Sequence, residues 1–125
     1  MTHNAYVLDW TMDDYGGLKA ALSEAGFAFD REAPEEHIRV TVPFARVEAF
    51  ARLCQPHLNA PFNYIDVQYP DEGKTVIIFR EALFNIADAE ENRRVQQWAI
   101  AQGLPPAQAD WGVSFAPSGD ESASE

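Results

Sequence analysis

FNYIDVQY at residues 62–69, PDEG at 70–73 and KTVIIFR at 74–80 give the clearest structural signal in this 125-residue sequence. In the first segment isoleucine, valine and tyrosine alternate with polar neighbours, the pattern of a strand with one buried face. PDEG has the composition of a turn, so the two flanking segments predict a β-hairpin. The VIIF run in the second strand is apolar on both faces, which predicts a central strand covered on both sides.

The rest of the sequence predicts three helices and three more strands. Apolar stripes at helical spacing predict helices from Asp13 or Asp14 to residue 25, between Pro43 and Pro56, and between Asp88 and Gly103. On the last helix the stripe is expected to place Val95, Trp98 and Ala99 against the core. The three additional strands are expected at residues 4–10, 27–31 and 37–42.

The resulting order, βαββαββα, predicts an α+β fold with a mostly antiparallel sheet and three helices. We expect the first six elements to form a ferredoxin-like βαββαβ core, to which one strand and a C-terminal helix are added. Residues 1–115 are expected to form a single α+β domain. Residues 116–125 are acidic and serine-rich, and we expect them to form a disordered tail.

Net charge is the strongest global feature. The chain has twenty acidic and nine basic residues and a net charge of −11, and the acidic surplus lies in residues 1–40 and 81–125. A negative field repels nucleic acid and anionic membranes and attracts basic protein surfaces. No apolar run is long enough to span a bilayer. We therefore expect no direct binding to nucleic acid and no membrane association.

The single cysteine, Cys54, bears on both location and chemistry. One cysteine makes no internal disulfide, and the N-terminus lacks a secretory signal, so a cytoplasmic location is expected. Cys54 lies on the apolar stripe of the second helix, where a thiol is usually buried and inert. His57 is separated from it by a helix-breaking proline, so a Cys–His nucleophile is not expected.

Signatures of metal, cofactor and catalytic sites are missing from the sequence. The three histidines, His3, His37 and His57, are 34 and 20 residues apart, so we expect neither a metal site nor a cofactor. The sequence has neither a phosphate-binding loop nor a GxSxG motif. Asp66, the candidate carboxylate inside the predicted strand at residues 62–69, is expected on the exposed face. These features argue against an enzyme.

The leading hypothesis is a non-enzymatic acidic protein-binding module, of the inhibitor, immunity or antagonist type. It would engage a basic partner, such as a nucleic-acid-binding protein. The candidate partner-binding residues are Asp13, Asp14, Glu35, Glu36, Glu90 and Glu91. These pairs also have a structural explanation, since they lie at predicted helix starts or in a loop.

Two alternatives remain open from the sequence. One is a small-ligand-binding or enzymatic α+β domain, whose pocket would contain Asp66, His37 or His57. The other is a homo-oligomeric structural subunit, such as a homodimer formed through the sheet edge or the tryptophan-bearing C-terminal segment.

Overall fold

A computed structural model describes residues 4–7, 11–31, 38–109 and 111 of the chain. Its strands are β1 (Ala5–Val7), β2 (Ala28–Arg31), β3 (Ile38–Thr41), β4 (Tyr64–Tyr69), β5 (Lys74–Phe79) and β6 (Ala82–Ile86). Its α-helices are α1 (Tyr15–Glu24), α2 (Val47–Cys54) and α3 (Ala89–Ala101). The predicted tail and parts of several predicted loops lie outside the described residues.

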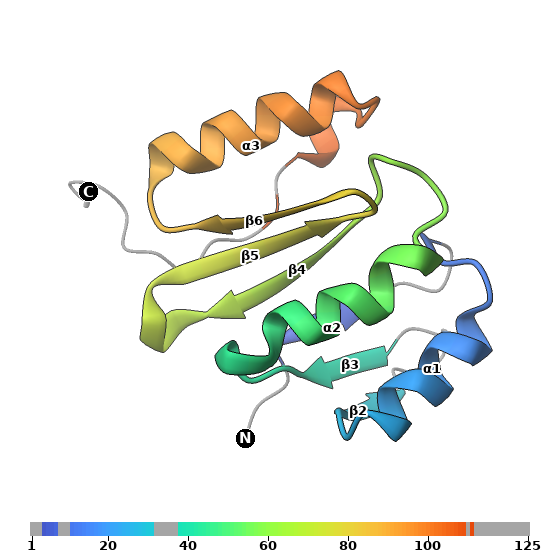
Figure 1. Ribbon diagram of the computed structural model, residues 1–125. Helices are drawn as coiled ribbons and strands as arrows, with labels where there is room; N and C mark the ends of the chain where they lie inside the picture. The colour runs from blue at the N-terminus through green and yellow to red at the C-terminus, as the bar shows by residue number, and fades with distance from the viewer. Residues whose placement is uncertain (1–3, 8–10, 32–37, 110, 112–125) are drawn as a thin grey trace.

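The strands form one antiparallel sheet in the order β2-β3-β1-β4-β5-β6, with α1 and α2 on one face and α3 on the other (Figure 1). The predicted α+β class, with an antiparallel sheet and three helices, is confirmed. None of the helices in the described part of the chain is long and apolar enough to cross a membrane.

The prediction of five strands was wrong, because the sequence analysis missed β6. The strand pairs with β5 over five residue pairs and follows it through a two-residue turn at Arg80 and Glu81. That turn has none of the glycine, asparagine or aspartate that usually marks a tight hairpin. The sheet therefore extends two strands beyond β4, and the predicted arrangement with one added strand does not describe it.

The first core lies between the sheet and the helices α1 and α2. Leu18 and Leu22 of α1, with Phe50 and Cys54 of α2, are fully buried against aliphatic side chains of the strands. The rings of Phe27 and Phe50 meet edge to face, with centroids 5.6 Å apart. In the strands with an alternating pattern, every second side chain points into this core, as the two-residue period of a strand predicts.

The second core, on the opposite face, is aromatic. Phe79 lies at its centre, with ring centroids 4.7 Å from Trp98 and 6.3 Å from Trp111. Nε1 of Trp111 donates a hydrogen bond to Asn92 of α3 over 2.7 Å, which ties the end of the described chain to the helix. From Thr75 to Phe79, β5 is buried on both faces, as predicted.

Helix α3 turns Val95, Trp98 and Ala99 towards the second core, as predicted. Val95 and Ala99 are buried, and Trp98 is partly buried, with its ring centroid 4.7 Å from that of Phe79 and 5.1 Å from that of Phe84. The apolar stripe of α3 thus packs on β5 and β6.

Candidate functional site

A row of side chains crosses the α3-bearing face of the sheet from one edge to the other. Strand pairing places Asp30 beside Arg39 and Arg39 beside Tyr6. Because Ala5 is paired with Val67, Tyr6 falls next to Asp66 on β4. Beyond Asp66 the row continues into apolar residues of β5 and β6 beneath α3. The face therefore changes from charged to apolar at β4.

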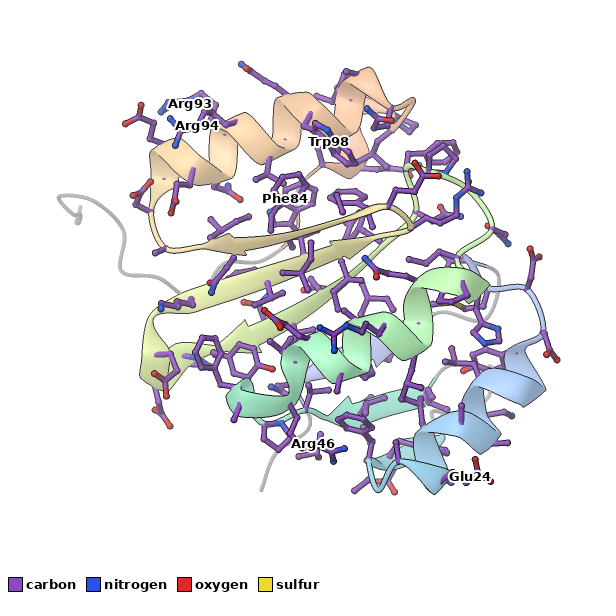
Figure 2. The ribbon with its side chains drawn as sticks, viewed as in Figure 1. Glu24, Arg46, Phe84, Arg93, Arg94 and Trp98 are labelled. Atoms are coloured by element: carbon purple, nitrogen blue, oxygen red, sulfur yellow. The ribbon has the colours of Figure 1, made fainter. Side chains whose placement is uncertain are left out.

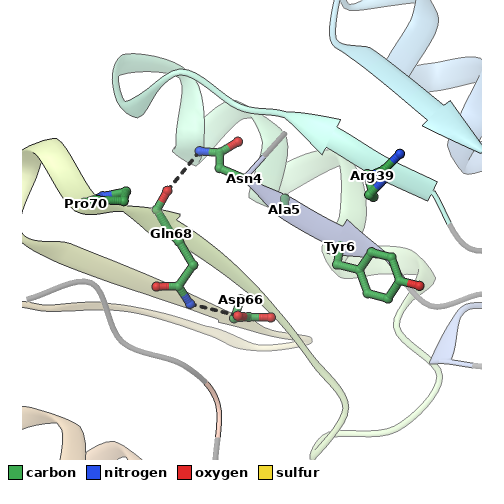
Figure 3. Close-up of a pocket in the computed structure, with 7 residues that line it drawn as sticks. All are labelled: Asn4, Ala5, Tyr6, Arg39, Asp66, Gln68 and Pro70. Atoms are coloured by element: carbon green, nitrogen blue, oxygen red, sulfur yellow. Dashed lines mark hydrogen bonds between the residues drawn. The ribbon is translucent and has the colours of Figure 1, made fainter. Parts of the chain in front are cut away.

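The charged half of this row borders a surface hollow of about 310 Å³ (Figure 3). The hollow is lined by Asn4, Ala5, Tyr6, Arg39, Asp66, Gln68 and Pro70. Tyr6 is 37% exposed, one of two large apolar side chains that are exposed in the described part of the chain.

The carboxylate of Asp66 is held by a short chain of hydrogen bonds. Buried Thr75 donates from Oγ1 to Oε1 of Gln68 over 2.9 Å, and Nε2 of Gln68 donates to Oδ2 of Asp66 over 2.8 Å. Because Thr75 is fixed inside the sheet, it orients the amide, and the amide orients the carboxylate. A preorganised carboxylate of this kind suits a cationic or hydrogen-bond-donating group.

Asn4 fixes the other side of the hollow. Its side-chain amide donates to the carbonyl oxygens of Val42 (2.9 Å) and Gln68 (3.2 Å) and accepts from the N–H of Val42 over 2.8 Å. One side chain thus bridges the chain after β3 to β4. This bridge fixes the backbone on one side of the hollow.

Among the described residues that line the hollow, none has an imidazole for acid–base chemistry with Asp66. His57 lies on another part of the molecule, with Nδ1 2.8 Å from the carbonyl oxygen of Asp13, and His37 lies outside the described residues. Within the described residues, no group of three or more histidine, cysteine, aspartate or glutamate side chains could hold a metal ion.

Asp13 and Asp14 are exposed at the start of α1. Asp14 is the N-cap, in a left-handed conformation (φ 52°), and its carboxylate accepts a hydrogen bond from the N–H of Gly17 over 3.3 Å. A Cβ at Gly17 would collide with this carboxylate, which explains a glycine inside the first helical turn. Asp13 is joined by backbone and side-chain hydrogen bonds to His57.

Glu90 and Glu91 lie in the first turn of α3. Both already have partners: Glu90 pairs with Arg94 at 3.2 Å, and Glu91 accepts the N–H of Ala87 at 2.9 Å. Figure 1 shows that α3 begins at the end of the sheet opposite to the start of α1. The structure therefore separates this pair from Asp13 and Asp14.

Strand pairing places two acid-bearing connections at one end of the sheet. Val7, at the end of β1, is paired with Ile38, at the start of β3, and Ile38 is also paired with Arg31, at the end of β2. The chain leaves Val7 towards Asp13 and Asp14. It leaves Arg31 towards residues 32–37, which include Glu35 and Glu36 and lie outside the described residues.

Most of the acidic surplus lies outside the described residues. They contain twelve acids and nine bases, a net charge of −3, so the other 8 of the 11 negative charges belong to residues 8–10, 32–37, 110 and 112–125. Two of these segments connect strand ends or helix starts at the end of the sheet where β1 ends. The negative charge is thus unevenly distributed along the chain.

Cys54 is fully buried on α2, in agreement with the predicted inert thiol. Burial raises the pKa of this thiol far above its ordinary value. The thiolate that a nucleophile needs is therefore suppressed.

Neither a protein-family model, nor a curated protein, nor a solved structure significantly matches this chain. Its function therefore has to be argued from its own residues.

Sequence reasoning placed Asp66 on the outward face of its strand, and the structure agrees. It missed Tyr6 and Arg39 as its neighbours. Each of them lies at an outward position of an alternating strand, which is the signal that the sequence carries. Only the strand order, with β1 between β3 and β4, brings the three together.

Proposed function

We propose that this protein is a non-enzymatic acidic binding module for a basic partner protein, with its docking site at the end of the sheet where β1 ends. The observation that carries the proposal is the pairing of Val7 with Ile38 and of Ile38 with Arg31. This pairing makes neighbours of the strand ends at which the β1–α1 and β2–β3 connections begin. Asp13 and Asp14 lie in the first connection, and Glu35 and Glu36 in the second.

Electrostatics gives such a surface a kinetic role. Clustered charge of one sign raises the association rate with an oppositely charged protein, and salt screens the effect over about 10 Å at 0.1 M. Asp13 and Asp14 are both exposed, and only Asp14 is committed to a helix cap. The pair Glu90 and Glu91, at the other end of the sheet, is left out of the proposed site.

The test compares two variants with the same change of charge. D13K/D14N adds three positive charges at the proposed site, and asparagine keeps the capping group and tolerates the left-handed backbone. D71K/E72Q adds the same charge at exposed residues of the β4–β5 turn, at the opposite end of the sheet. The partner is captured from native-host lysate on immobilised protein at about 0.05 M and about 0.5 M salt.

Association rates of the captured partner are then measured for both variants. We expect D13K/D14N to slow association by roughly tenfold at low salt and D71K/E72Q to slow it far less. Equal effects of the two variants would assign the binding to net charge alone. Binding that is unchanged between the two salt concentrations would refute an electrostatic site.

A second candidate function, the binding of a small organic cation, is favoured by the fixed carboxylate of Asp66 beside the ring of Tyr6. A primary amine could contact the carboxylate while its positive charge lies over the aromatic face. In an NMR titration with phenethylamine, backbone signals of Tyr6 and Gln68 should shift in the wild type. The isosteric D66N variant should lose these shifts, and their persistence would place the amine elsewhere.

The ferredoxin-like arrangement of the first six elements also remains a proposal. Its support is that β1 lies between β3 and β4, with α1 and α2 packed on the same face of the sheet. In this interpretation β5, β6 and α3 are an addition next to β4.

A further inference from the structure

The hollow beside Asp66 is also lined by a positively charged group, the guanidinium of Arg39. Strand pairing places Arg39 next to Tyr6 and Tyr6 next to Asp66, so the tyrosine occupies the position between the two charges. All three side chains lie on the same face of the sheet and line the hollow (Figure 3). A ligand in this hollow therefore meets a positive charge, a negative charge and an aromatic ring.

The two amides that line the hollow are already committed to partners within the protein. The side chain of Asn4 is hydrogen-bonded to backbone groups of Val42 and Gln68. The side chain of Gln68 accepts from Thr75 and donates to Asp66. The charged groups and the ring are thus the features by which this hollow can select a ligand.

Both charged groups keep hydrogen-bonding capacity for a ligand. Asp66 is half-buried and accepts from Gln68 through one oxygen, whereas a carboxylate can accept about four hydrogen bonds. Arg39 is exposed, and its five N–H donors are more than a contact with one carboxylate uses, such as that of its strand neighbour Asp30. A plain amine at Asp66 would share the hollow with a like charge, and a carboxylate on the same ligand would turn this repulsion into attraction.

We propose that the hollow binds a short zwitterion whose ammonium and carboxylate groups lie at opposite ends, as in an ω-amino acid. The ammonium group contacts the carboxylate of Asp66, and the ligand's carboxylate contacts the guanidinium of Arg39. The methylene groups between them lie on the ring of Tyr6. This inference rests on the second candidate function, cation binding at Asp66, and is independent of the acidic docking site.

The dimensions of the sheet favour a ligand with separated charges. Neighbouring strands are about 4.8 Å apart, so Arg39 and Asp66, on either side of Tyr6, are about 10 Å apart across the sheet. Charge-assisted hydrogen bonds of about 2.8 Å at both ends leave roughly 4 Å between the charged groups of the ligand. An α-amino acid has both charges on one carbon, so a chain of a few methylene groups matches this span better. The volume of about 310 Å³, near the lower end for ligand pockets, also suits a small molecule.

The test is an NMR titration of the full-length chain with γ-aminobutyrate, butylamine, butyrate and glycine. γ-Aminobutyrate has both charges at opposite ends, butylamine and butyrate have one charge each, and glycine has both charges on one carbon. γ-Aminobutyrate should shift the backbone signals of Tyr6 and Gln68 and the side-chain N–H signal of Arg39. Its dissociation constant should be about fivefold lower than that of butylamine, and butyrate and glycine should also bind more weakly than γ-aminobutyrate.

Three variants assign the two ends of the ligand. R39Q should remove the preference for γ-aminobutyrate without weakening the binding of butylamine, whereas the isosteric D66N should lose both ligands. R93Q removes the same charge as R39Q from an exposed residue in the first half of α3 that does not line the hollow, and it should change neither affinity (Figure 2). Circular dichroism confirms that each variant is folded.

The outcomes distinguish this inference from the function on which it rests. A wild type that binds butylamine as tightly as γ-aminobutyrate refutes the zwitterion and leaves the second candidate function standing. If no probe shifts the signals of Tyr6 and Gln68 up to about 50 mM, both are overturned. Equal effects of R39Q and R93Q refute the contact with Arg39, and glycine that binds as tightly as γ-aminobutyrate refutes the separation of the charges.

Discussion

On the face of the sheet that carries α3, strands β5 and β6 lie beneath aromatic side chains, whereas β2, β3 and β1 carry charged and polar ones and have none of the described helices over them. One row of residues crosses both halves. It runs through Asp30, Arg39, Tyr6 and Asp66 on the open side and through Ile77 and Phe84 on the covered side. The boundary falls at β4.

The dimensions of the elements explain this division. A helix with its side chains is about 10 Å wide, and neighbouring strands are about 4.8 Å apart, so one helix covers roughly two strands. The opposite face has two helices and is apolar over a wider area. A six-stranded sheet with a single helix on one face therefore has to leave part of that face polar, and the open part becomes available for binding.

The largest expected change in the free energy of unfolding distinguishes the covered half of this sheet face from the open half. Ile77→Ala removes a fully buried side chain from the covered half and should lower the free energy of unfolding by about 3 to 4 kcal/mol. Tyr6→Ala, at the open part of the same row, should lower it by only about 0.5 to 1 kcal/mol, because the ring is already partly in solvent. Urea unfolding of the two variants measures the difference.

Similar losses in the two variants would show that the open half is covered in solution, for instance by another part of the chain or a second copy. Ile77→Val is the control for the covered half. It removes one methylene and should cost about 1 kcal/mol.

The alternation of residues in β4 predicted which of its side chains are buried and which face outward. It did not predict where in the sheet the boundary between the open and the covered half falls. Ile65, Val67 and Tyr69 are buried and Asp66 and Gln68 face outward, as their spacing indicates. Whether an outward residue meets solvent or a helix depends on which strands lie beneath α3. That information is in the strand order, which pairs residues far apart in the chain, as in β1 with β4, and leaves no local pattern in the sequence.

The missed strand has a local explanation. β6 follows β5 through Arg80 and Glu81, residues that usually do not mark a hairpin turn, so the sequence gives no local sign that a strand begins there. The stripe of α3 correctly indicated its apolar side. How deeply each residue of that stripe is buried, as in the partly buried Trp98, is a matter of packing and not of periodicity.

The next effect in size sharpens the contrast between the two faces of β4. Burial raises the pKa of Tyr69 to about 12. Between about pH 10 and pH 12 the folded protein keeps a proton that the unfolded chain has released. The free energy of unfolding should therefore be unaffected by this group below pH 10 and fall by about 2 kcal/mol as the pH rises to 12.

Urea unfolding of the wild type and Tyr69→Phe at pH 9, 10, 11 and 12 isolates this contribution. The variant keeps the ring that packs edge to face on Phe44, with centroids 4.9 Å apart, and should lose that part of the decline. The buried thiol of Cys54 also opposes ionisation, but it is present in both proteins and cancels in their difference. Identical pH profiles would show that Tyr69 reaches solvent.

The smallest effect concerns what keeps α3 over the covered half. Asp88 is the N-cap of α3, and its Oδ1 accepts the N–H of Glu91 over 2.8 Å. Asp88→Ala should cost about 1 kcal/mol in urea unfolding, whereas Asp88→Asn keeps an accepting oxygen and should cost less than half of that. Since Asp88 lies outside both cores and the open hollow, its removal tests the helix start alone. Trp98 fluorescence in the folded state should stay unchanged in both variants; a red shift in Asp88→Ala would mean that this one cap also holds the helix against Phe84.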